Sequence, residues 1–159
     1  MPHFTYADSP YPVRPGLQDA HRNYWQALAN PGTWFSGAQR VAIAAEVRNA
    51  LDCPFCAERK AALSPNALKG EHRSGTTLDS RVVDAVHRVI TDQSRITQSW
   101  IDANTAAGFS VVQFVEVVGS AVGVLCVVGC CGALGLPGEG LADAVPGEPS
   151  HCRPGAAGD

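Results

Sequence analysis

Charged residues are scarce in this chain, and the charge patterns that mark several classes of protein are missing. Only 17% of the 159 residues are Asp, Glu, Lys or Arg, and the formal net charge is −3. The twelve Lys and Arg form no basic stripe and do not alternate with aromatic residues, so nucleic acid is not an expected partner. With 45% hydrophobic residues, so few charges indicate that copies of the chain cover part of one another's surface.

The N-terminus also lacks the parts of a signal peptide. Residues 1–8 contain neither a basic run nor an apolar stretch, so we expect a cytoplasmic protein. In a reducing compartment, the six cysteines are expected to be free thiols apart from a catalytic pair, because structural disulfides belong mainly to oxidising compartments.

Alternation of apolar and polar residues with a period of two, which marks half-buried strands, is nearly absent, so the expected fold class is all-α. Ser36 followed by Gln39 predicts a capping box, Ser110 predicts another N-cap, and Gly108 suits the C′ position of a helix. Helical spacing of apolar residues predicts helices over residues 17–30, 37–52, 54–63, 78–92, 96–107 and 111–134.

Composition divides the chain into three parts. Residues 1–35 form an N-terminal arm and a first helix, and the four prolines within residues 1–16 favour an extended segment on the surface, outside the core. Residues 36–136 form the helical domain. Residues 137–159 are rich in Pro and Gly and are expected to be a linker or a wrapping arm.

One expected helix is long enough to span a bilayer. Residues 117–136 carry no charge. The segment nevertheless lacks Trp or Tyr anchors and a basic flank, so a membrane partner is not expected. A helix buried inside an oligomer is the preferred interpretation, since such helices are also apolar on all sides.

The segment Cys53-Pro54-Phe55-Cys56 is the strongest chemical motif. Two thiols three positions apart can form a disulfide across one helical turn, and a nearby positive charge can lower the pKa of a thiol enough to make it a nucleophile. A glutaredoxin would place this motif after a strand, whereas here a helix precedes it. A zinc site would need two further ligands, and none of the available cysteines and histidines forms a second CxxC, so no metal is predicted. The residues available as further zinc ligands are Cys126, Cys130, Cys131, His151 and Cys152. The first three of them are expected to be small buried hydrophobes.

The thiol pair between two helices resembles the carboxymuconolactone decarboxylase and alkylhydroperoxidase D-like family. The resemblance covers about residues 34–136 and rests on Arg40, the Cys-Pro-Phe-Cys segment and the helix pair within residues 79–108. It implies an all-α bundle that assembles into trimers or hexamers and uses no cofactor. It also implies a peroxidase in which Cys56 attacks the peroxide and Cys53 resolves the resulting sulfenic acid. The implied partners are a peroxide or another small molecule and an unidentified thiol reductant.

The sequence departs from the peroxidase members of that family at their proton relay. Those members carry a glutamate twelve positions before the first cysteine and histidines two and seven positions after it, where this chain has Val41, Phe55 and Lys60. Glu46 lies two helical turns before Cys53, and Lys60 lies one turn after Cys56. Lys60 could stabilise a thiolate, and Glu46 could relay a proton, although both also suit an exposed helix face.

Two histidines are further candidates for a base. His87 lies at the edge of an inward-facing helical stripe, where a structural histidine is the more common interpretation. His72 lies in the polar connector of residues 69–77, where an active-site loop could sit. The candidate catalytic residues are therefore Cys56, Cys53, Glu46, Lys60 and His87.

Three functions remain open at this point. The first is a thiol-dependent peroxidase or disulfide oxidoreductase. The second is a decarboxylase-like enzyme in which the thiols line the pocket of a small molecule. The third is a non-catalytic oligomeric binding protein with a decayed site.

Overall fold

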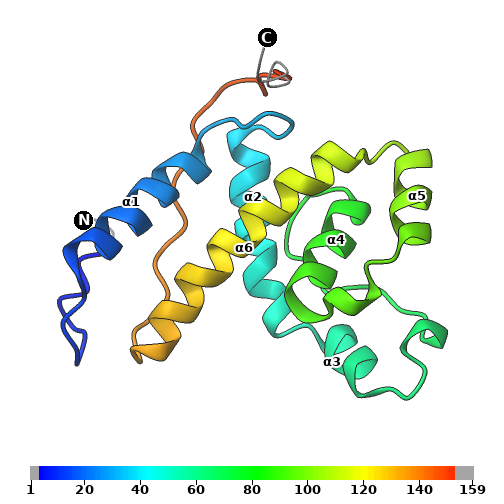
Figure 1. Cartoon of the computed structure of the whole chain (residues 1–159), viewed down its shortest axis with the longest axis horizontal. Helices are drawn as coiled ribbons and strands as arrows, with labels where there is room; N and C mark the ends of the chain where they lie inside the picture. The colour runs from blue at the N-terminus through cyan, green and yellow to red at the C-terminus, as the bar shows by residue number, and fades with distance from the viewer. Residues whose placement is uncertain (1–3, 153–159) are drawn as a thin grey trace, which may run out of the picture.

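The computed structural model describes residues 4–152, which form six α-helices and two short 3₁₀ helices without a strand (Figure 1). The all-α prediction is confirmed. The α-helices are α1 (Pro15–Ala29), α2 (Gly37–Leu51), α3 (Pro54–Ala61), α4 (Ser80–Thr91), α5 (Gln98–Ala106) and α6 (Val111–Ala133). The 3₁₀ helices η1 (Pro65–Ala67) and η2 (Gln93–Arg95) lie in connectors and were not predicted.

Local capping residues set the ends of three helices as the sequence predicts. Ser36 Oγ accepts a hydrogen bond from the backbone N–H of Gln39 at 3.3 Å, and the side chain of Gln39 accepts one from the backbone N–H of Ser36 at 2.9 Å. Ser110 forms the same capping box at the start of α6. Gly108 follows α5 with φ +93°, a conformation that glycine adopts without strain.

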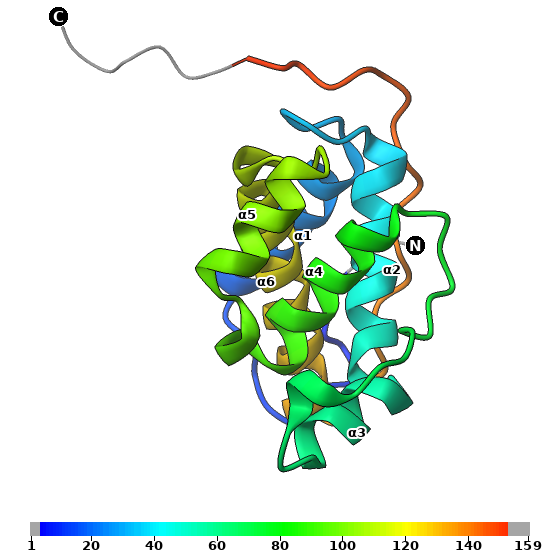
Figure 2. The same ribbon diagram turned by 90° about the vertical axis from the view of Figure 1, so that its right-hand side faces the viewer.

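Three helices form the centre of the molecule. α6 crosses α2 and α4, and α2 and α4 pack side by side (Figures 1 and 2). Val47, Val86 and Val117, one from each helix, are fully buried in the shared core. α1 covers α2 and α6, and α3 packs against α4 where α2 ends. This arrangement places the thiol pair at the edge of the core.

The long apolar helix α6 buries only one of its faces. Val117, Ala121 and Val124 are fully buried, whereas Val115 and Val122 on the other face are exposed. By length and composition alone, α6 could cross a membrane, a property that it shares with the core helices of soluble proteins. The expectation that Cys126, Cys130 and Cys131 are all buried is wrong, because Cys126 is exposed and Cys130 is partly exposed.

The two terminal segments contribute to the packing of α1. The expectation that the N-terminal arm stays outside the core is wrong for Phe4, which is fully buried with its ring edge-to-face against Trp25 at 5.3 Å. Burial of this large ring outweighs the local preference for an extended surface segment. The C-terminal segment is a wrapping arm, because Gly140 accepts a hydrogen bond from Trp25 Nε1 at 2.8 Å and Val145 donates one to Ala29 at 2.8 Å (Figure 1).

We expect Gly37→Ala to destabilise the fold, because α1, α2 and the C-terminal arm meet at this glycine. A Cβ atom there would lie 2.3 Å from the carbonyl oxygen of Ala29 and 2.6 Å from that of Val145. The expected loss in free energy of unfolding is about 1–3 kcal/mol, measured by urea denaturation. Gly16→Ala is the matched control in the first turn of α1, where nothing lies within 4 Å of the added atom. Equal stability of the two variants would contradict the close approach at Gly37.

Candidate functional site

The thiol pair lies where α2 gives way to α3. α2 ends at Leu51, and Pro54 opens α3 because its fixed φ suits the first helical position. Cys53 is therefore the N-cap of α3, and Cys56 lies within its first turn. Both cysteines are buried, because Cys53 is 2% exposed and Cys56 is 4% exposed.

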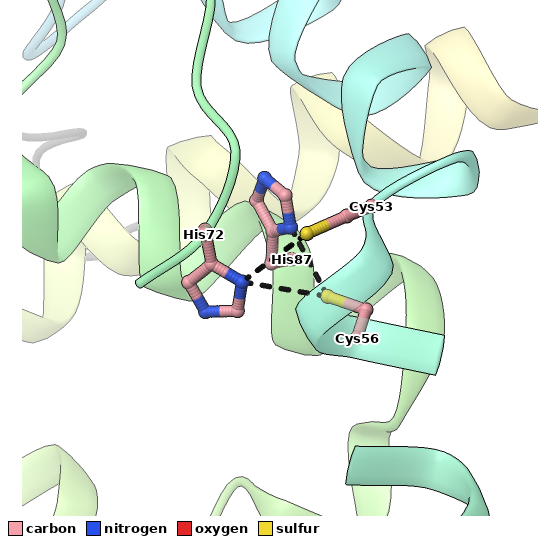
Figure 3. Close-up of side chains that lie close together, drawn as sticks. All are labelled: Cys53, Cys56, His72 and His87. Carbon is pink, nitrogen blue, oxygen red and sulfur yellow. Dashed lines mark hydrogen bonds between the residues drawn. The ribbon is translucent and has the colours of Figure 1, made fainter. Parts of the chain in front are cut away.

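Two histidines from distant parts of the chain face these sulfurs (Figure 3). Nδ1 of His87, on α4, lies 3.1 Å from Sγ of Cys56. Nδ1 of His72, in the connector between η1 and α4, lies 3.4 Å from Sγ of Cys56 and 3.9 Å from Sγ of Cys53. These four ligand atoms all lie within 4.8 Å of one another. Each sulfur is therefore surrounded by polar groups, although it is buried.

Each imidazole is hydrogen-bonded to a carboxylate on the side of the ring that faces away from the sulfurs. His87 Nε2 lies 2.9 Å from Oε1 of Glu46, and both side chains are fully buried. His72 Nε2 lies 3.0 Å from Oδ1 of Asp84. With Nε2 donating to a carboxylate, each ring is fixed in one orientation, and its Nδ1 is directed at the sulfurs.

Further hydrogen bonds hold the two carboxylates in place. Ser74 and Thr76, both from the connector, donate to Oε2 of Glu46 at 2.8 Å. Trp100 Nε1 and Arg88 Nε donate to Oδ2 of Asp84, also at 2.8 Å. The site therefore draws on α2, α3, α4, α5 and the connector, and its geometry depends on how these segments pack.

The electrostatics of the cluster favour a thiolate next to imidazolium. Burial alone would raise the pKa of Cys56, but hydrogen bonds from His72 and His87 outweigh it and lower the pKa to about 5. Burial alone would lower the pKa of His72, but Asp84 and the two sulfurs raise it to about 10. The pKa of His87 is raised in the same way by Cys56 and Glu46, against the effect of burial. Cys56 is therefore mainly a thiolate at neutral pH.

The structure brings together four of the five candidate catalytic residues. Cys53, Cys56 and His87 are in contact, and Glu46 joins them through His87. Lys60 is exposed near the end of α3, and within residues 4–152 no hydrogen bond or ion pair joins it to the cluster. Its expected role as the thiolate's cationic partner is therefore not supported, and two histidines occupy that position.

The sequence reasoning did not assign the second carboxylate–histidine arm. His72 was considered as a base, but Asp84 was not considered, although it lies three positions before His87 and so near the same face of α4. The other cysteines and His151, which the sequence offered as further metal ligands, do not belong to this group. His72 and His87 are the side chains that lie with the two thiols.

A cavity of about 610 Å³ lies beside the cluster. His72 lines this cavity and also contacts both sulfurs, so it stands at the boundary between the two. Arg59 and Lys69 add positive charge to the wall. The remaining lining residues are Phe55, Leu68, Gly70, Glu71, Ser74, Thr76, Leu78, Ser80, Val83 and Asp84.

Comparison of the chain with protein-family models, with curated proteins and with solved structures finds no match.

The low pKa of Cys56 predicts how its alkylation depends on pH. Because thiolate is the reacting form, the rate of alkylation by iodoacetamide should rise with pH around a midpoint of about 5, followed by peptide mass spectrometry. His72→Ala removes one stabilising hydrogen bond, so it should raise the midpoint and slow the reaction by about tenfold at about pH 4, below the wild-type midpoint. His151→Ala, outside the cluster, should leave the profile unchanged. A wild-type midpoint in the ordinary thiol range would contradict the assignment.

Proposed function

We propose that the protein is a thiol-dependent peroxidase or disulfide oxidoreductase of the alkylhydroperoxidase D-like type. The observation that carries this proposal is the position of Cys56, whose sulfur lies within hydrogen-bond distance of two carboxylate-backed imidazoles. A second thiol, Cys53, belongs to the same group of atoms. A stabilised nucleophile, proton donors and a resolving thiol are the parts that such a reaction needs.

The first step of the proposed reaction is attack by the Cys56 thiolate on one peroxide oxygen. The O–O bond breaks, Cys56 becomes a sulfenic acid, and the departing oxygen takes a proton from His87 or His72. Cys53 passes its proton to His72 and, as thiolate, attacks the sulfur of the sulfenic acid; the departing hydroxide takes that proton back and leaves as water. The product is a Cys53–Cys56 disulfide, with peroxide reduced by two electrons, and an external thiol reductant restores the dithiol.

Cys56 suits the attacking role better than Cys53 does. It contacts both imidazoles, whereas Cys53 contacts only His72, at the longer distance of 3.9 Å. The pKa of Cys53 is also lowered, because the backbone N–H of Cys56 and the ring of His72 outweigh the effect of burial. The surroundings therefore lower the pKa of both thiols, which is the direction that each step requires.

The positions of His72 and His87 also bear on the proton relay. This chain lacks that relay at the positions where the family that it resembles carries it. That family's relay histidines lie close to the thiols along the chain, whereas His72 and His87 come from the connector and α4. Their contacts with Cys56 supply the same kind of proton donor from other positions. We therefore prefer a working thiol site to a decayed one.

The neighbouring cavity favours one second candidate, a decarboxylase-like enzyme acting on a small molecule. The cavity of about 610 Å³ is lined by Arg59 and Lys69 and also by Glu71 and Asp84, so it would suit a small polar compound. In this case His72 would contact the substrate, and the thiols would only form part of the wall behind it. Carbon dioxide release from such a compound, retained in Cys56→Ser, would favour this second candidate over the first.

A thiol titration tests the proposed peroxidase chemistry. One equivalent of hydrogen peroxide at neutral pH should remove two free thiols per chain together, and mass spectrometry should locate the new bond between Cys53 and Cys56. Cys56→Ser should abolish this loss, since no thiolate remains to attack. Cys130→Ser, on α6, is the control and should keep it. No thiol loss in the metal-free, reduced wild-type protein would overturn the proposal.

We also propose that the protein is a cytoplasmic homo-oligomer in which copies pack through α6. The exposed face of α6 carries an unbroken apolar stripe that runs along the whole helix, for about 34 Å at 1.5 Å per residue. Its small residues allow close approach of a second copy. The stripe consists of Val111, Val115, Gly119, Val122, Cys126, Gly129 and Ala133.

Light scattering tests this association. The wild-type protein should have the mass of a trimer or a larger assembly, and Val122→Glu should dissociate it, because a charge in the stripe would lose its hydration in the interface. Val145→Glu changes an exposed valine outside α6 and should leave the mass unchanged. A monodisperse wild-type monomer would contradict the proposal.

A further inference from the structure

The two thiols and two imidazoles that face one another are also a complete ligand set for one metal ion. We propose that Cys53, Cys56, His72 and His87 bind a single Zn²⁺ ion in the reduced protein, as a closed tetrahedral site. This inference concerns binding and stands apart from the proposed peroxidase chemistry.

Three distances between the ligand atoms are close to those of a tetrahedral zinc site. Bonds of about 2.3 Å to sulfur and about 2.0–2.1 Å to nitrogen place neighbouring ligand atoms about 3.3–3.8 Å apart. Here the Cys56–His87, Cys56–His72 and Cys53–His72 atom pairs are 3.1, 3.4 and 3.9 Å apart. All four atoms lie within 4.8 Å of one another, so small side-chain movements bring them around one ion.

The hydrogen bonds behind the histidines supply a second and independent reason. Histidines that bind zinc through one ring nitrogen usually donate from the other to a carboxylate, which fixes the tautomer and the ring. His72 and His87 both have this arrangement, with Asp84 at 3.0 Å and Glu46 at 2.9 Å. In the neutral form, each ring then presents the lone pair of Nδ1 to the centre of the cluster.

The types of ligand and their burial select the kind of metal. Two thiolates and two imidazoles suit Zn²⁺, whereas Mg²⁺ and Ca²⁺ prefer oxygen ligands. All four ligands come from the protein, and Cys53, Cys56 and His87 are buried, which leaves no open position for a reacting water. The site is therefore of the closed, structural kind, and it ties α3 to α4 and to the connector.

Zinc and a disulfide compete for the same electron pairs on sulfur. If the proposed function also holds, oxidation releases the ion: the zinc dithiolate, one hydrogen peroxide and two protons give the disulfide, Zn²⁺ and two waters. The zinc-bound protein would then be a protected form of the thiol pair, and the metal-free dithiol would be the reactive form.

Cobalt is the probe for this site, because Co²⁺ takes the same geometry as Zn²⁺ and is coloured. Reduced, metal-free protein titrated with Co²⁺ without oxygen should show thiolate-to-cobalt charge-transfer and tetrahedral bands that saturate at one ion per chain. Zn²⁺ should remove these bands at one equivalent. Asp84→Asn, which keeps all four ligands, should weaken binding by about 10–100-fold. His151→Ala and Cys130→Ser are the controls and should bind as wild type.

Two outcomes would overturn the zinc site: no charge-transfer band, or a spectrum that His72→Ala leaves unchanged. A measurement on the wild-type protein makes the test independent of how variants fold. Zn²⁺ at one equivalent should protect Cys53 and Cys56 from alkylation while the exposed Cys126 still reacts, and equal reactivity would count against the site. The peroxide titration of metal-free protein is a separate readout, so either proposal can fail while the other stands.

Discussion

The buried contact between Glu46 and His87 is the interaction on which the rest of this structure depends. Both side chains are fully excluded from solvent in the middle of the α2–α4 packing. A buried ionisable group is costly unless it is paired, and removing one member of such a pair commonly costs about 3–5 kcal/mol. Ser74 and Thr76 complete the hydrogen bonding of the carboxylate, so the pair is well satisfied. The apolar core can therefore contain the Glu46–His87 pair at the position where the core borders the thiols.

The second arm of the site, formed by Asp84 and His72, differs from the first in the segment that carries its histidine. His87 is carried by a core helix, whereas His72 is carried by a connector that also forms the wall of the cavity. Arg88 and Trp100 hold Asp84 on the helix side of this contact. One imidazole is thus positioned by a core helix and the other by a connector, and the second one separates the sulfurs from the cavity.

Most of the helices and the thiol pair could be predicted from sequence, because caps and apolar spacing act over a few residues. Ser36, Gly108 and Ser110 are examples of such local signals, and α6 ends within one residue of its predicted position. The assembly of the site could not be predicted in the same way. Glu46 and His87 are separated by 41 positions, and only tertiary packing brings them together. Lys60 could be proposed because a spacing along one helix is visible in the sequence, whereas the contact between Asp84 and His72 depends on packing and is not.

The C-terminal arm completes the hydrogen bonding of α1. Trp25 and Gly140 are 115 positions apart, and the indole N–H of Trp25 donates to the carbonyl of Gly140. Val145 likewise donates to the carbonyl of Ala29 at the end of α1. A chain cut before residue 140 would lose both partners, so these two polar groups of α1 would have to bind water instead.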